Sequence, residues 1–111
     1  MHSTELLKGT LQTIILKLLS DNPRMYGYEI TQRVKEQSEG TIQLTEGALY
    51  PALHRLEAEG YLKTETMKVG KRIRKYYSLT RNGRMTANER LAEFASFIRT
   101  MTVVLRIKPQ P

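Results

Sequence analysis

The chain has 111 residues, no cysteine and a formal net charge of +7, a length that fits one domain or a small domain with one appended helix. Without cysteine it has no disulfide framework, thiol nucleophile or thiolate metal site, and its modest core is compatible with an oligomer. No stretch approaches the roughly 18 uninterrupted apolar residues of a membrane span and no signal peptide is recognisable, so we expect a soluble cytoplasmic protein.

Two helices are predicted in the first 40 residues. Leucine and isoleucine recur at helical spacing over residues 4–20, on a face wide enough to be buried on more than one side. Pro23 ends this helix, because proline disfavours helical backbone in the residue before it. A second helix is predicted over residues 26–38, with Tyr28, Ile30 and Val34 facing the core.

A third helix is predicted to begin at Thr45, which can accept backbone N–H bonds there, and to end near Gly60. Its apolar stripe consists of Leu49, Ala52, Leu53 and Leu56. Its opposite face consists of Gly47, Pro51, His54 and Ala58, flanked by Tyr50 and Arg55. This face is nearly free of acidic residues and suits insertion into a groove, although an ordinary core helix is the alternative interpretation.

Pro51 lies inside this predicted helix. A proline removes the hydrogen bond to the carbonyl four residues before it, here that of Gly47, and its ring crowds that carbonyl. We therefore expect a first helical turn that is distorted or that starts late.

A β-hairpin is predicted over residues 61–69 and 72–80, where side chains alternate in character and Gly70 marks the turn. Two helices joined by a brief turn and followed by such a two-stranded wing form a winged helix-turn-helix. The predicted fold class is therefore α+β, mainly helical. The tip of the wing, Val69-Gly70-Lys71-Arg72, is basic and small, and we expect it along phosphates or in a minor groove.

The positive charge is concentrated in and around this hairpin. Residues 1–40 contain five basic and five acidic side chains, whereas residues 61–84 contain eight basic residues and one acid, Glu65. The excess of seven in residues 61–84 equals the net charge of the whole chain. A charged run is commonly just a solvated face, but this concentration favours a polyanion as the partner.

A long helix is predicted over about residues 84–106, where apolar residues are spaced by four and three in alternation from Ala87 onward, as in a heptad seam. We predict that it forms a dimer interface with Leu91, Phe94, Ile98, Met101 and Leu105. A support helix within the same subunit is the alternative. The expected organisation is a winged-helix DNA-binding domain at residues 1–82, a dimerisation helix at 83–108 and a disordered tail at 109–111.

Three stretches together resemble the PadR family of transcriptional regulators. They are TLQTIILKLLSDNPRMYGYEI (10–30), TEGALYPALHRLEAEGYLKTE (45–65) and KRIRKYYSLTRNGR (71–84). The resemblance implies a winged helix with a dimerising C-terminal helix, as in the family's smaller subgroup, and binding of double-stranded DNA at a palindromic operator. It assigns Thr45, Tyr50, His54 and Arg55 to the recognition helix and Lys71, Arg72 and Arg74 to the wing.

Some members of the family are released from DNA by small aromatic or drug-like ligands. In this chain no residue pattern supports an effector, because Phe94 and Phe97 are more simply explained by core packing and tryptophan is absent. The resemblance therefore implies a small-molecule effector only as a property of some relatives.

The sequence predicts a homodimeric, sequence-specific DNA-binding regulator that acts as a repressor without a cofactor or metal. The alternative is a winged-helix module that binds protein or RNA, since fold does not fix function. An enzyme is disfavoured, because no histidine and acid spacing for a metal, no phosphate loop and no nucleophile elbow occurs.

Overall fold

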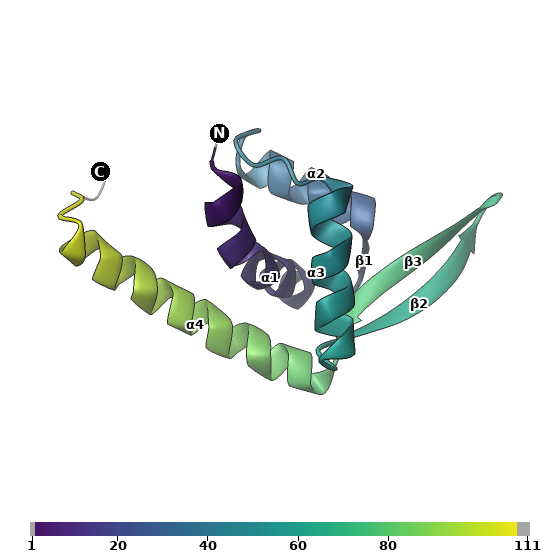
Figure 1. Ribbon diagram of the computed structural model, residues 1–111. Coiled ribbons are helices and arrows are strands. Elements are labelled where there is room, and N and C mark those ends of the chain that lie inside the picture. The colour runs from purple at the N-terminus through teal and green to yellow at the C-terminus, as the bar shows by residue number, and fades with distance from the viewer. Residues whose placement is uncertain (1, 109–111) are drawn as a thin grey trace.

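The computed structural model describes residues 2–108. Its elements, in chain order, are α1 (Thr4–Asp21), β1 (Met25–Tyr26), α2 (Gly27–Gln37), α3 (Glu46–Ala58), β2 (Leu62–Val69), β3 (Arg72–Leu79) and α4 (Arg81–Val104). The helices α1, α2 and α3 form a body from which the β2–β3 hairpin extends on one side and α4 on the other (Figure 1). Within the described residues no helix is long and apolar enough to cross a membrane. The predicted tail at 109–111 lies outside the described residues.

The core lies where α1, α2 and α3 meet the root of the hairpin. The largest fully buried side chains are Ile15, Leu16, Leu19, Met25, Ile30, Leu49, Leu53, Leu56 and Tyr77. The leucine stripe predicted for the third helix is confirmed, because its three leucines are buried completely. Full burial of a leucine side chain is worth about 1.5–3 kcal/mol, so this stripe fixes α3 to the body.

The helix α3 begins directly after its N-cap residue, so the late start expected from Pro51 does not occur. Thr45 is the cap residue, and its side-chain oxygen accepts a hydrogen bond from the backbone N–H of Ala48 at 3.2 Å. The helix then runs without interruption from Glu46 through Pro51. Gly47 and Pro51 are both exposed, so water can solvate the carbonyl that the proline leaves without a helical partner.

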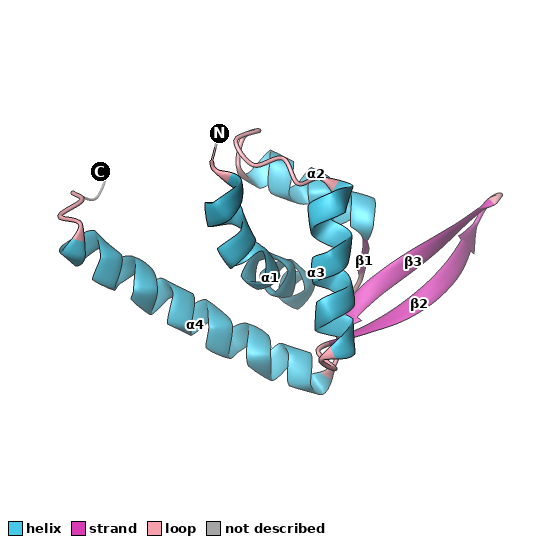
Figure 2. Cartoon of the chain, viewed as in Figure 1, coloured by secondary structure: helices cyan, strands magenta, loops and turns pink. Residues whose placement is uncertain are grey.

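The predicted hairpin is confirmed, and it belongs to a sheet with a third strand that the sequence did not reveal. The antiparallel order is β1-β3-β2, with β2 and β3 paired from Leu62 opposite Leu79 to Val69 opposite Arg72 (Figure 2). Gly70 has a φ of +62°, a conformation that glycine adopts at little cost. The strand β1 has only two residues, too few to show an alternation.

The end of α3 and the start of α4 are tied together by four residues, which we call the joint: Gly60, Tyr61, Thr80 and Gly83. The Thr80 hydroxyl donates to the Gly60 carbonyl at 2.7 Å, and the Thr80 N–H donates to the Tyr61 carbonyl at 3.0 Å. Thr80 also caps α4, accepting from the Gly83 N–H at 3.0 Å. A Cβ on Gly83 would collide with the Tyr61 carbonyl oxygen, so the backbones touch here.

The two halves of α4 differ in what covers them. In the first half Ala87 is buried and the Arg90 guanidinium donates to Gln12 of α1 at 2.6 Å. The second half leaves the body, with Ile98 50% exposed and Leu105 61% exposed. The first half thus supports its own subunit, whereas the apolar seam of the second half has little cover from the described residues.

Candidate nucleic-acid interface

One hollow of about 350 Å³ is lined by side chains from three parts of the molecule. We call it the concave surface. Its lining comprises Tyr26, Gly27 and Tyr28 at the start of α2, Tyr50 and His54 on α3, and Ile73, Arg74, Lys75 and Tyr77 on β3. The predicted recognition helix and the predicted wing therefore meet on one side of the molecule.

The predicted recognition residues are not equally free. His54 and Arg55 are exposed, whereas Tyr50 is half-buried and its ring centroid lies 6.4 Å from that of His54. A Cβ on Gly27 would lie 2.5 Å from the Tyr50 hydroxyl, so Tyr50 packs tightly over the start of α2. Thr45 is exposed but already caps α3, which fixes its side chain near the helix start. Of these residues, His54 and Arg55 have the greatest freedom to contact another molecule.

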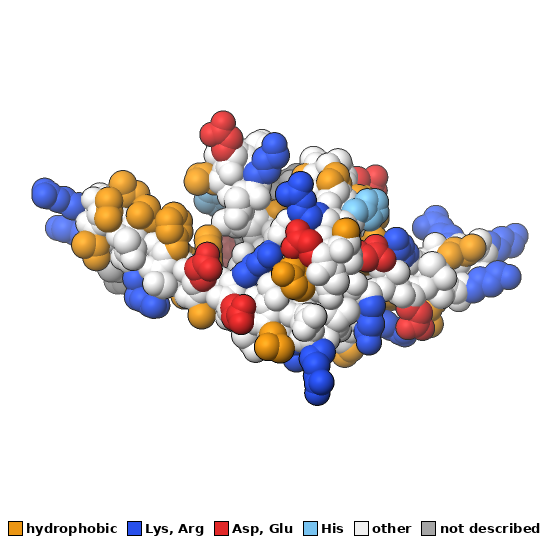
Figure 3. All heavy atoms as spheres, turned by 60° about the horizontal axis from the view of Figure 1, so that its bottom comes forward, with side chains coloured by type: hydrophobic (Ala, Val, Ile, Leu, Met, Phe, Trp, Pro, Cys, Tyr) orange, Lys and Arg blue, Asp and Glu red, His pale blue; other side chains and the backbone are white. Residues whose placement is uncertain are grey.

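The wing residues lie along the arm that leaves the body. Lys71 and Arg72 are exposed at its tip, and basic side chains gather at this end in Figure 3. None of the ion pairs formed within residues 2–108 involves Lys71, Arg72 or Arg74. Lys75, by contrast, lies 3.8 Å from the Glu57 carboxylate of α3. The three predicted wing cations therefore keep their full charge for a partner.

Stacked rings and guanidinium groups brace the root of the wing. The Arg74 guanidinium lies 4.4 Å from the centroid of the Tyr26 ring, and that of Arg24 lies 4.9 Å from the Tyr76 ring. The two tyrosines meet edge to face at 5.5 Å. A hydrogen bond with the Tyr76 side chain raises the pKa of Arg74 above its ordinary value, so this guanidinium stays charged. The stack holds Arg74 in place at the edge of the concave surface.

Buried Tyr77 stays neutral beneath the same surface. Burial, together with the nearby Glu57 carboxylate, raises the pKa of its phenol above the usual value. Glu57 also accepts a hydrogen bond from the Thr64 hydroxyl at 3.2 Å, which links α3 to β2. Within the described part of the chain, no group of three or more His, Cys, Asp and Glu side chains could hold a metal ion.

Comparison with known proteins identifies the family. Residues 15–89, well over half of the chain, match the Transcriptional regulator PadR-like family. The chain belongs to the PadR family. This PadR-family chain is 36% identical over 85 residues to the transcriptional regulator Rv3488 of Mycobacterium tuberculosis, which covers 77% of the chain and 76% of that protein. It is also 33% identical over 98 residues to the uncharacterised protein X of Lysinibacillus sphaericus, covering 86% and 87%.

Solved structures of regulators share the fold. A transcriptional regulator from Clostridium thermocellum superposes with a TM-score of 0.81 at 29% identity, over 96% of this chain and 100% of that one. A PadR family transcriptional regulator from Eggerthella lenta gives 0.80 at 29% identity, over 94% and 88%. The predicted winged-helix fold and the predicted class of function, transcriptional regulation, are confirmed.

The structure of this PadR-family chain adds residues that the sequence did not assign to the surface. Tyr28, expected in the core, is 63% exposed and lines the concave surface. Helical geometry contained the signal, because residues two apart lie about 200° around the helix and Ile30 already faces the core. Ile73 was expected only as part of the strand alternation, and it too lines this surface.

Proposed function

We propose that this PadR-family regulator is a homodimer that binds double-stranded DNA at a palindromic operator and represses transcription there. The observation that carries the proposal is the meeting of the exposed face of α3 with the basic wing on the concave surface. A helix suits the major groove, and cations on a flanking hairpin suit the phosphates beside it. The alternative partners, protein and RNA, have no such single observation in their favour.

Some of these side chains would contact base edges and so recognise the sequence, whereas others would contact the backbone and fix the position of the protein on the duplex. Arg55 and His54 are the candidates for base edges, and arginine pairs best with guanine through two hydrogen bonds. Tyr50 and Thr45, which are held by packing and by the cap, contact phosphates or a thymine methyl. The wing cations contact phosphates, which adds affinity without sequence preference.

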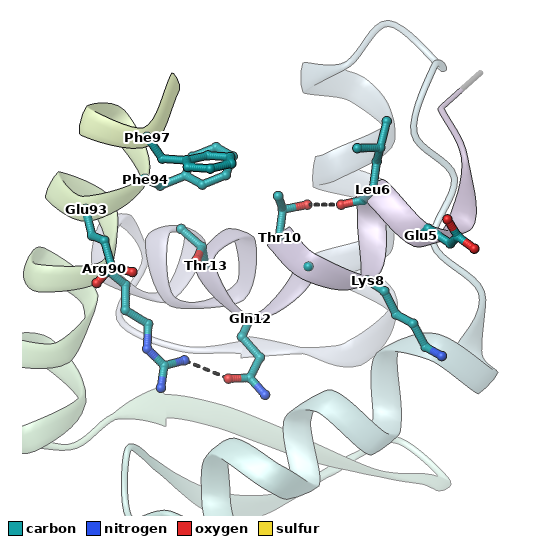
Figure 4. A pocket seen from close by; sticks show the side chains of 11 residues that line it. Glu5, Leu6, Lys8, Thr10, Gln12, Thr13, Arg90, Glu93, Phe94 and Phe97 are labelled. Carbon is teal, nitrogen blue, oxygen red and sulfur yellow. Dashed lines mark hydrogen bonds between the residues drawn. The ribbon is translucent and has the colours of Figure 1, made fainter. Parts of the chain in front are cut away.

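The apolar seam along α4 supplies the dimer interface. This seam consists of Leu91, Phe94, Ile98, Met101 and Leu105, of which Leu91, Ile98 and Leu105 are exposed and Phe94 and Met101 are half-buried. Between α1 and α4 lies a hollow of about 720 Å³, over which Phe94 and Phe97 project side by side (Figure 4). A second copy of α4 laid along the seam would also cover Phe94 and Phe97 at this hollow, and burial of apolar area is the main source of stability in such contacts.

Two-fold symmetry then sets the form of the operator. Two copies of α3 would reach half-sites in successive major grooves, separated by roughly 34–36 Å or a multiple of that distance. In this proposal residues 1–82 are the DNA-binding unit and residues 83–108, which contain most of α4, are the dimerisation segment. The joint connects the two. A small aromatic ligand in the hollow between α1 and α4 would compete with the partner helix and release the DNA.

Selection of duplexes from a random pool by the purified protein tests this function. The expected result is a palindromic consensus whose half-sites have the spacing given above, retained in the presence of excess competitor DNA. A sequence without two-fold symmetry would contradict the dimer. A failure to retain any duplex at low salt, with RNA or a protein retained instead, would contradict DNA binding.

A further inference from the structure

Ile73 is a large apolar side chain in the most basic part of the chain. It lies on β3 between Arg72 and Arg74, opposite Lys68 of β2, and is 73% exposed. Its side chain lines the concave surface together with Tyr50 and His54 of α3. Ile73 therefore points toward the same side as the recognition helix and extends that surface outward.

Within the described residues Ile73 has little cover, with 73% of its surface exposed. Alternation along β3 places it on the same face as Tyr77 and Leu79, which are buried at the root of the wing. The wing extends away from the body (Figure 1), and along this face β3 is buried at Tyr77 and Leu79 but exposed at Ile73. An isoleucine this exposed offers an apolar contact to a molecule that packs on the wing.

The surrounding charges indicate which partner fits. Lys68 lies opposite Ile73 on the same face of the wing, and Lys71 and Arg72 precede it at the tip, so these cations would repel the same wing of a second copy. They attract the phosphates on both sides of a DNA groove. An apolar residue between such cations is typical of proteins that insert a side chain into the minor groove and kink the duplex.

We propose that Ile73 is an apolar wedge that enters the minor groove beside each half-site, between phosphates held by the wing cations. This inference rests on the proposed binding of double-stranded DNA. A wedge that unstacks a base step bends the duplex toward the major groove, and pyrimidine–purine steps such as TA and CA bend most easily. Ile73 thereby gives the protein a preference for flexible steps outside the bases that α3 touches.

The test compares Ile73→Ala with Val69→Ala on a duplex recovered by selection. Val69 is 39% exposed on the same hairpin, but it pairs with Arg72 and so lies on the opposite face of the wing. Affinity is measured over a series of salt concentrations, and the bend is measured by the gel mobility of circularly permuted fragments. An unchanged melting temperature checks that both variants fold.

Ile73→Ala is expected to weaken binding about five- to twenty-fold, with a smaller bend and an unchanged salt slope, because apolar contact is lost and phosphate contacts are kept. Val69→Ala is expected to match the unsubstituted protein. Unchanged affinity and bend in Ile73→Ala would overturn the wedge while leaving DNA binding intact. If the unsubstituted protein binds no duplex at all, the proposed function fails first and the wedge fails with it.

Discussion

The wing and the second half of α4 are two arms that leave one body with opposite surfaces. Basic side chains gather on the wing, whereas hydrophobic side chains gather along α4 at the other end of the molecule (Figure 3). Both arms are rooted at the joint, since β2 follows Tyr61 directly and α4 follows Thr80. The two surfaces therefore suit partners of different chemistry. Because both arms start at the joint, the joint fixes the position of one surface relative to the other.

The largest effect, a loss of stability, is expected from a substitution in the joint, where both arms begin. Gly83→Ala should lower the free energy of unfolding by about 3 kcal/mol, because its Cβ would collide with the Tyr61 carbonyl and separate α4 from the end of α3. Urea unfolding measures this. Gly9→Ala in α1 is the matched control: no atom lies within 4 Å of its Cβ, and alanine should stabilise the helix by about 0.5–1 kcal/mol. Equal stability of the two variants would show that the joint is not tight.

The next largest effect is expected from a substitution in the apolar seam of α4, which should disrupt the dimer and leave each subunit folded. Ile98→Asp should convert the dimer into a folded monomer, because a carboxylate cannot be buried in the apolar seam without a large penalty. Operator affinity should fall about 100-fold or more, since the two half-sites are then bound separately. Light scattering and DNA titration measure the two changes. Ser96→Asp, an exposed position on the opposite side of α4, should remain a dimer. A dimer that survives Ile98→Asp would place the interface elsewhere.

A smaller effect is expected in the groove face itself. Arg55→Ala should cost about 1–3 kcal/mol of binding free energy when one particular base pair is present, and much less when that pair is replaced. Titration against a set of operators substituted one position at a time measures the pattern. A uniform loss on every operator would make Arg55 a phosphate contact.

The smallest effect is expected at the tip of the wing, where a substitution should weaken binding without changing sequence preference. Lys71→Ala should weaken binding to all sequences alike and lower the slope of log affinity against log salt by about 0.9, the value for one phosphate contact. Salt titrations of both proteins on a specific and a random duplex provide the comparison. An unchanged slope would remove Lys71 from the contact with DNA.

The sequence by itself determined what repeats along the chain. Helical spacing gave the buried stripe of α3, alternation gave the hairpin, and the seam of α4 was visible from its heptads. The positive charge of the wing was evident from the number of basic and acidic residues in its sequence. These patterns report which residues share a face of one element, and that information is local.

Only the tertiary structure decided which of those faces are covered. The same seam of α4 is buried in the core at Ala87 and open at Ile98, and the same face of β3 is buried at Tyr77 and open at Ile73. Tyr28 on the concave surface, β1, and the contact of Gly83 with Tyr61 also depend on elements that meet only after folding. Periodicity shows which residues share a face of one element, but it does not show how far that face lies from other elements. The exposure of a binding surface therefore follows from the arrangement of the elements in space.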